Sequence, residues 1–181
     1  VAGINCSLLR LVISVDPAAT AHTPGSDPDY TVIQLWGMDR AKHYRILLNQ
    51  WRARTSDPRA IGRVLKRWVA AYHPDKLIIE AQAVDKLFAR GMQDVVGFPV
   101  SMRAVGAARG NEIEAFRDLI QSGLALIPWA RDRLGTRSTF HSFVQELSDY
   151  PFGDHDDTLF AAIHAYSALR TPEMAEVKAV V

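Results

Sequence analysis

The sequence has a single cysteine, Cys6, which excludes an internal disulfide and suits a reducing compartment such as the cytoplasm. It also has no apolar run close to the roughly eighteen residues that a membrane-spanning helix needs. The opening segment, VAGINCSLLR, lacks the basic, apolar and small-residue order of a signal peptide. An initiator methionine is missing, so we expect this chain to be part of a longer polypeptide.

Several catalytic motifs are missing as well. The histidines and the cysteine show no zinc-binding spacing, and no G-x-S-x-G sequence marks a serine nucleophile. The G-x-x-x-x-G-K-[ST] phosphate loop is absent, which excludes an intact ATP-driven motor from this chain. The net charge of +1 neither requires nor excludes nucleic acid, because phosphate binding depends on a local basic surface.

The 181 residues do contain a regular alternation of apolar patterns. Continuous β-branched and apolar runs predict strands, whereas apolar residues spaced three and four apart predict helices. The predicted strands are 8–16, 30–39, 42–53, 75–81, 98–105 and 124–128, and the predicted helices are 58–72, 83–92, 111–123 and 136–150, with one more after Asp157. This order predicts an α/β fold with a mixed central sheet, three antiparallel strands followed by parallel strands, flanked by helices. We find no linker or repeat, so we expect a single domain over 1–181 with a core at about 8–170.

Acidic residues stand at three places where these elements end or begin. Asp16 ends the first strand, Glu80 ends the fourth, and Asp156 and Asp157 precede the last helix. If the first and fourth strands are adjacent and parallel, Asp16 and Glu80 converge at one edge of the sheet, and the helix can bring a third acid there. Such a group of carboxylates can bind Mg²⁺ or Mn²⁺. Two of these ions, about 3.5–4 Å apart, are suited to phosphodiester hydrolysis.

Each acid also has a purely structural interpretation. Asp16 could be a turn residue, since a proline follows it. Asp154, Asp156 and Asp157 could stabilise the start of the helix through its free amides and its dipole, by up to about 1 kcal/mol each. Glu80 is harder to explain in this way, because a carboxylate at the end of a buried strand is costly unless it is paired or binds a metal.

The histidines leave more than one interpretation open. His155, which stands among the acids, could be a metal ligand, a proton shuttle or a solvated turn residue. His141 and His164 lie within predicted helices, and we expect both of them at the protein surface or at the edge of the core.

Taken together in this order, the segments VISVDPAAT, LIIEAQAVDKLF and FVQELSDYPFGDHDD resemble the C-terminal nuclease domain of phage or prophage terminase large subunits, which has a ribonuclease H-like fold. The resemblance runs from about Leu11 to Tyr166. Its most specific part is the last segment, where an aromatic-Pro-aromatic-Gly step leads to His-Asp-Asp at the head of a helix. One position departs from the family's pattern, because Phe160 stands where a further aspartate is usual.

The resemblance implies a divalent-metal-dependent DNA endonuclease that cuts concatemeric viral DNA during genome packaging, by two-metal phosphodiester hydrolysis. By position, it implies that Asp16, Glu80, Asp156 and Asp157 are both catalytic residues and ligands of two Mg²⁺ or Mn²⁺ ions, with His155 as an accessory residue. The implied partners are double-stranded DNA, the small terminase subunit, the portal and an ATPase domain that is absent from this chain. No membrane partner is implied, and the implied location is the cytoplasm of a bacterial host.

DNA backbone contacts are expected from arginine side chains, which can bind phosphate through two nitrogens. The candidates are Arg103, Arg109, Arg131, Arg133 and Arg137. Any one of them could instead be a solvated surface residue. Two other functions stay open. One is another ribonuclease H-like nuclease, of the junction resolvase or integrase type, and the other is a catalytically degenerate module that grips DNA or docks on the portal, for which Phe160 would be the sign.

Overall fold

Six strands form one sheet in the part of the chain that the computed structural model describes, residues 9–18, 29–39, 41, 43–80, 86–103, 109–128 and 140–169. The strands are β1 (Leu9–Asp16), β2 (Thr31–Asp39), β3 (Arg45–Ala53), β4 (Lys76–Glu80), β5 (Val100–Arg103) and β6 (Ala125–Leu126). Their order across the sheet is β5-β4-β1-β2-β3-β6. β1, β2 and β3 pair antiparallel, whereas β4 pairs parallel with β1, β5 with β4 and β6 with β3. The predicted mixed sheet is therefore confirmed.

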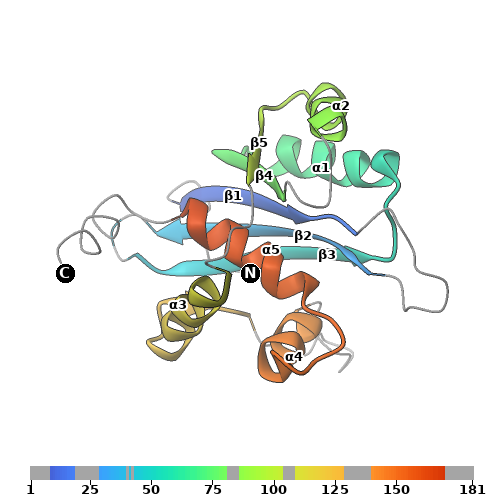
Figure 1. Ribbon diagram of the computed structural model, residues 1–181. Helices are drawn as coiled ribbons and strands as arrows, with labels where there is room; N and C mark the ends of the chain where they lie inside the picture. Colours follow the sequence, from blue (N-terminus) through green and yellow to red (C-terminus); the bar gives the residue numbers. More distant parts are fainter. Residues whose placement is uncertain are drawn as a thin grey trace, which may run out of the picture.

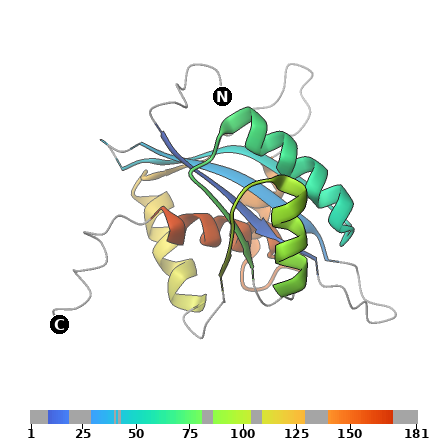
Figure 2. The same cartoon turned by 90° about the horizontal axis from the view of Figure 1, so that it is seen from above.

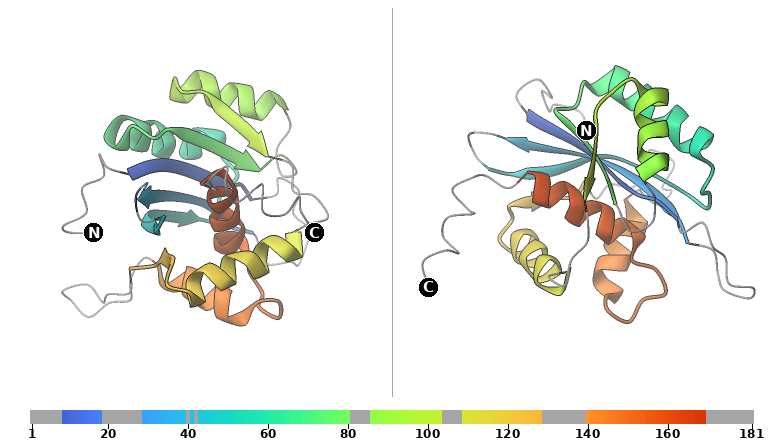
Figure 3. Two further views of the ribbon diagram at one scale, coloured as in Figure 1. Left: turned by 90° about the vertical axis from the view of Figure 1, so that its left-hand side faces the viewer. Right: turned by 45° about the horizontal axis from the view of Figure 1, so that its top comes forward.

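Helices cover both faces of this sheet (Figure 1, Figure 3). They are α1 (Pro58–Tyr72), α2 (Lys86–Val96), α3 (Arg109–Gln121), α4 (His141–Asp149) and α5 (Asp157–Ala168). α1 and α2 lie on one face, and α3, α4 and α5 lie on the other. The first residues of the helices predicted at 83–92 and 136–150 lie outside the described part of the chain. No helix among the described residues is long and apolar enough to cross a membrane.

The ends of α1 follow from its sequence. Asp57 occupies the N-cap position, and its side chain accepts a hydrogen bond of 2.9 Å from the backbone N–H of Arg59. Pro58 takes the first helical position, where a backbone N–H would have no partner within the helix. His73 ends the helix in the left-handed conformation, with φ 47°. The helix predicted over 58–72 is confirmed.

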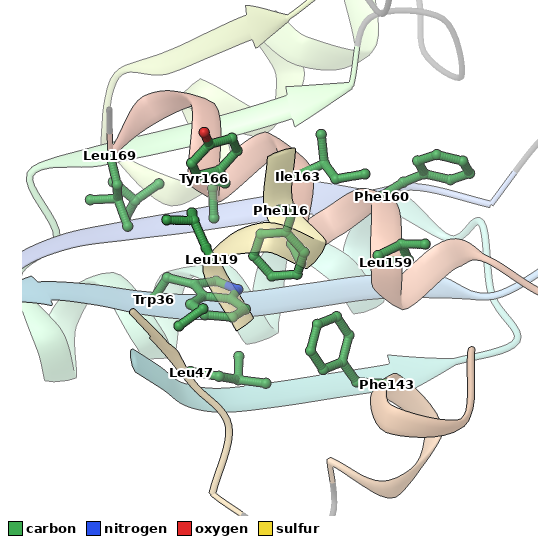
Figure 4. Packing of buried hydrophobic residues seen from close by; sticks show 14 of the residues in the cluster. Trp36, Leu47, Phe116, Leu119, Phe143, Leu159, Phe160, Ile163, Tyr166 and Leu169 are labelled. Atoms are coloured by element: carbon green, nitrogen blue, oxygen red, sulfur yellow. The ribbon is translucent and has the colours of Figure 1, made fainter. Parts of the chain in front are cut away.

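The side chains of the strands pack into two separate hydrophobic cores, one on each face of the sheet, because successive residues of a strand face opposite sides. In β1, Ile13 packs with residues of α1 and α2, whereas Val12 packs with residues of α3, α4 and α5. The second core is rich in aromatic residues (Figure 4). In it the rings of Trp36 and Phe116 meet edge to face with their centroids 5.8 Å apart. Asp16 follows Val12 by four residues and so lies on the α5 side of the sheet.

Helix α5 belongs to this second core along most of its length. All of its residues from Thr158 to Tyr166 are buried, so no side of the helix is open to solvent over this stretch. Figure 2 shows it lying across the strands. Phe160 packs in the core and is 5% exposed. A core side chain therefore occupies the position at which the resemblance leads us to expect an acid.

Candidate metal centre

Two acidic residues meet where β1 and β4 end. The two strands are adjacent and parallel, and their register pairs Val15 with Ile79. The next residue of each strand is acidic, so Asp16 and Glu80 lie side by side. Both are buried, with 8% and 5% of their surface exposed. The predicted convergence of the first and fourth strands is confirmed, and it is strand register that holds the two carboxylates together.

Helix α5 adds a third polar residue to this place, His164. One ligand atom from each of Asp16, Glu80 and His164 lies within 4.8 Å of the other two. The Nε2 atom of His164 is 3.3 Å from Oε2 of Glu80, and His164 is 1% exposed. The expected position of this histidine at the surface or at the edge of the core is therefore wrong.

The sequence does carry a signal for His164. The stretch LFAAIHAY is otherwise almost wholly apolar, and a histidine buried within it needs a polar partner from another element. His164 also follows Asp157 by two helical turns, which places both residues on the same side of the helix. This spacing from the first aspartate of the helix is the feature of the sequence that points to His164.

Asp156 and Asp157 begin α5, and the group of three found among the described residues does not include them. Asp156 occupies the N-cap position, but within the described part of the chain its side chain makes no capping hydrogen bond. The capping comes instead from Glu146 of α4, whose Oε2 accepts the backbone N–H of Thr158 at 2.7 Å and also the Thr158 hydroxyl. The interpretation of the two aspartates as a side-chain cap is weakened, and metal binding by them stays a prediction.

Asp157 lies in an anionic environment. Burial, followed by the carboxylates of Glu146 and Asp29, raises the pKa of Asp157 from 3.8 to about 6, and the N–H of Tyr30 and the ring of His155 lower it only in part. The Nδ1 atom of His155 is 3.9 Å from Oδ2 of Asp157. A cation beside Asp157 would offset this repulsion. An anionic environment of this kind is typical of a carboxylate that binds a metal ion.

The predicted DNA-binding arginines fall into two groups. Arg103 ends β5, and its guanidinium contacts Glu112, His164 and the carbonyl of Ile163. Arg109 is the first residue of α3. The other three candidates lie outside the described residues: Arg131, Arg133 and Arg137. DNA binding by these arginines stays a prediction, and for Arg103 the structure shows partners inside the protein.

The chemistry of the group suits a hard divalent ion. Two buried carboxylates side by side repel each other, and a bound cation is one way of offsetting that repulsion. Carboxylate oxygens are the ligands that Mg²⁺ and Mn²⁺ prefer. Asp16 and Glu80 therefore fit such an ion, whereas the nitrogen of His164 is a softer donor than these ions usually take.

The architecture places the chain in the ribonuclease H-like class of folds. The Mn-soaked, inhibitor-bound terminase nuclease domain of human cytomegalovirus matches with a TM-score of 0.62 at 13% identity, over 92% of this chain and 86% of that one. The magnesium-bound large terminase nuclease of thermophilic phage G20c gives 0.61 at 16% identity, over 88% and 81%. The P22 large terminase nuclease domain gives 0.62 at 14% identity, over 88% and 80%. At these identities the likeness shows the fold alone.

Sequence defines the family within this class. The family model of the terminase RNaseH-like domain matches residues 13–169, and the chain belongs to this family. This confirms the resemblance seen in the sequence. No relative among curated proteins matches the chain. Membership of the family supports a nuclease role in DNA packaging.

Proposed function

We propose that this chain is a divalent-metal-dependent endonuclease that cuts concatemeric viral DNA during genome packaging. One observation carries the proposal. Asp16 and Glu80 end two adjacent parallel strands, both are buried, and their carboxylates lie within 4.8 Å of each other and of His164. The terminase RNaseH-like family supplies the context of packaging. The nuclease of phage G20c has been solved with bound magnesium, which supports metal-dependent chemistry for this domain too.

Asp16 and Glu80 would hold the metal in this proposal. Asp156 or Asp157 would contribute a further carboxylate from the start of α5, with His155 as an accessory residue. The anionic environment of Asp157 supports this assignment, because a cation there would offset the repulsion that raises the pKa of its carboxyl. When bound, two Mg²⁺ or Mn²⁺ ions activate a water and stabilise the leaving oxygen of a phosphodiester.

The role of the protein fold is to fix the carboxylates of the site in position before the substrate binds. The register of β1 and β4 sets the positions of Asp16 and Glu80, so the carboxylates need little rearrangement during the reaction. Arginine side chains would bind the DNA phosphates, which makes DNA binding weakly dependent on sequence and strongly dependent on salt. In this proposal, an ATPase domain together with the small terminase subunit and the portal would deliver the DNA to this site.

The test compares Asp16→Asn and Glu80→Gln with Asp94→Asn as the matched control. Asp94 is an exposed residue of α2, on the other side of the sheet. Cleavage of linear, supercoiled and four-way-junction DNA is measured with Mn²⁺ and with Mg²⁺, and metal binding is measured by calorimetry. We expect the unchanged chain and Asp94→Asn to cut linear and supercoiled DNA, and the two site variants to lose about a hundredfold or more.

Two outcomes would contradict the proposal in different ways. A strong preference for the four-way junction would assign the domain to the resolvase type. A chain that cuts no DNA with Mn²⁺, and whose metal affinity is unchanged by Asp16→Asn, would be a degenerate module that only grips DNA or docks on a partner.

A further inference from the structure

His164 lies between a cationic and an anionic side chain. On one side, Nη1 of Arg103 is 3.1 Å from Nδ1 of the ring and also donates to the carbonyl of Ile163 at 3.3 Å. On the other side, Nε2 of the ring is 3.3 Å from Oε2 of Glu80. The second terminal nitrogen of Arg103 donates to Glu112. The four side chains thus form one continuous series of polar contacts, from Glu112 through Arg103 and His164 to Glu80.

The chemistry of arginine determines which ring nitrogen carries hydrogen. A guanidinium has five N–H donors and no acceptor, so Nδ1 of His164 must accept the hydrogen bond from Arg103. In a neutral imidazole the hydrogen then belongs to Nε2. Because Nε2 faces Glu80, the ring donates to this carboxylate. A nitrogen that carries hydrogen has no lone pair left for a metal ion, although its distance from both carboxylates would suit one.

We propose that Arg103 holds His164 in the Nε2–H tautomer, and that His164 is a positioning residue for Glu80 and not a metal ligand. The inference rests on the proposed function, since Glu80 is the metal ligand that His164 would orient. Hydrogen bonds from neighbouring side chains commonly orient ligands in this way, and their loss costs roughly tenfold to a hundredfold in metal affinity. A further consequence is that, within the described group of Asp16, Glu80 and His164, oxygen atoms alone are available to a metal, which favours Mg²⁺ or Mn²⁺ over ions that prefer imidazole.

The fold fixes this arrangement from several directions. Arg103 is the register partner of Glu80 in the parallel β4–β5 pair, so the two residues are neighbours across the strands. His164 comes from α5 and Glu112 from α3, and Ser167 Oγ also donates to Glu112 at 3.2 Å. The Arg103 and Glu112 side chains are both 22% exposed, and the His164 side chain is 1% exposed. A guanidinium held by an acid on one side is therefore kept in place to bind the ring on the other.

The tautomer can be measured directly on the whole 181-residue chain. Nitrogen-15 NMR of ring-labelled histidine distinguishes a nitrogen with hydrogen from one without, and His164→Gln identifies the signals of His164. We expect hydrogen on Nε2 and a bare Nδ1, both before and after saturation with Mg²⁺. Hydrogen on Nδ1 in the metal-free chain, or loss of the Nε2 hydrogen when Mg²⁺ binds, would overturn the inference.

The role of Arg103 in fixing the tautomer of His164 is tested in the same spectra. Arg103→Met removes the donor that faces Nδ1, so we expect part of the His164 population to take the other tautomer. Arg63→Met serves as the matched control, because Arg63 is an exposed arginine of α1 on the other side of the sheet, and the Nε2–H tautomer should remain dominant in it. An unchanged His164 spectrum in Arg103→Met would show that arginine does not set the tautomer.

Two substitutions separate a positioning role from a ligand role. His164→Gln retains an N–H that can reach Glu80, whereas His164→Leu does not. We expect Mg²⁺ affinity, measured by calorimetry, to stay close to that of the unchanged chain in His164→Gln and to fall about tenfold in His164→Leu. Equal losses in both variants would indicate a ligand role and overturn the inference. If the unchanged chain binds no Mg²⁺ at all, it is the proposed function that fails, and the metal-free spectra still decide the role of Arg103.

Discussion

Replacing Asp157 by asparagine should change how the stability of the domain depends on pH. Burial and the nearby carboxylates of Glu146 and Asp29 raise the pKa of Asp157 to about 6 in the folded protein, against an ordinary value of 3.8. Folding therefore favours the protonated form of this group. Well below pH 3.8 the carboxyl is protonated in both states and the raised pKa has no cost. The cost in free energy grows as the pH rises and is complete above about pH 6, where the folded protein must hold the charged form.

The magnitude follows from the same two values. Between pH 4 and pH 8 the charge on Asp157 should cost about 2–3 kcal/mol of unfolding free energy, and Asp157→Asn removes this pH dependence. Asparagine keeps an oxygen that can accept the Tyr30 N–H. Its amide nitrogen would replace Oδ2, which is buried and has no hydrogen-bond partner among the described residues, at a cost of roughly 1 kcal/mol at every pH. We thus expect the variant to be more stable by about 1–2 kcal/mol at pH 8 and slightly less stable at pH 4.

Urea unfolding of both proteins at half-unit steps from pH 4 to pH 8 measures this difference, in the absence of divalent ions. The quantity to compare is the change with pH of the difference in unfolding free energy between the two proteins. Asp149→Asn is a suitable control, because Asp149 is an exposed residue at the end of the neighbouring helix α4. A difference that stays constant over the whole range would refute the argument that burial and charge repulsion penalise the ionised Asp157.

Three further predictions concern the framework around the site. Glu146→Ala should lower the unfolding free energy by about 3 kcal/mol, because it leaves the Thr158 N–H and hydroxyl without their buried acceptor. Thr158→Val should lower the unfolding free energy by less, and urea denaturation measures both variants. Gly37→Ala should cost about 1–3 kcal/mol in the same assay, since its Cβ would lie 2.6 Å from Cδ1 of Leu9 in the core. Phe152→Ser should leave the unfolding free energy within about 0.5 kcal/mol, because this ring is 94% exposed, and a larger loss would show a packing role.

Local sequence patterns were sufficient to predict most of the fold. The alternation of continuous and spaced apolar runs predicts the strands and helices in their order, and Asp57-Pro58 marks the start of α1. Boundaries were less accurate in short elements. The strand predicted at 124–128 is reduced to Ala125–Leu126, because its pairing with β3 extends over two residues only. Strand length there depends on the partner strand, which the local sequence does not contain.

The site was predictable where it depends on strand ends and not where it depends on contacts between distant elements. Asp16 and Glu80 each follow a β-branched run, so parallel pairing alone brings them together. His164 lies in an apolar helix, and its place near them depends on how α5 crosses the sheet. The charge of Arg103 predicts DNA binding, but its contacts with Glu112 and His164 arise only when three elements, β5, α3 and α5, are packed together.

Helix α5 has a consequence for how this domain can change over evolution. The same twelve residues contain core side chains such as Phe160 and Ile163 and the site residue His164, and its first residue is the candidate ligand Asp157. Under the proposed function, selection for folding and selection for cutting act on one short segment. Asp16 and Glu80 are also buried, but they end their strands and are not among the hydrophobic residues of either core. Variants with altered metal chemistry should be easier to obtain at the strand ends, whereas a library confined to α5 should yield mostly unfolded protein.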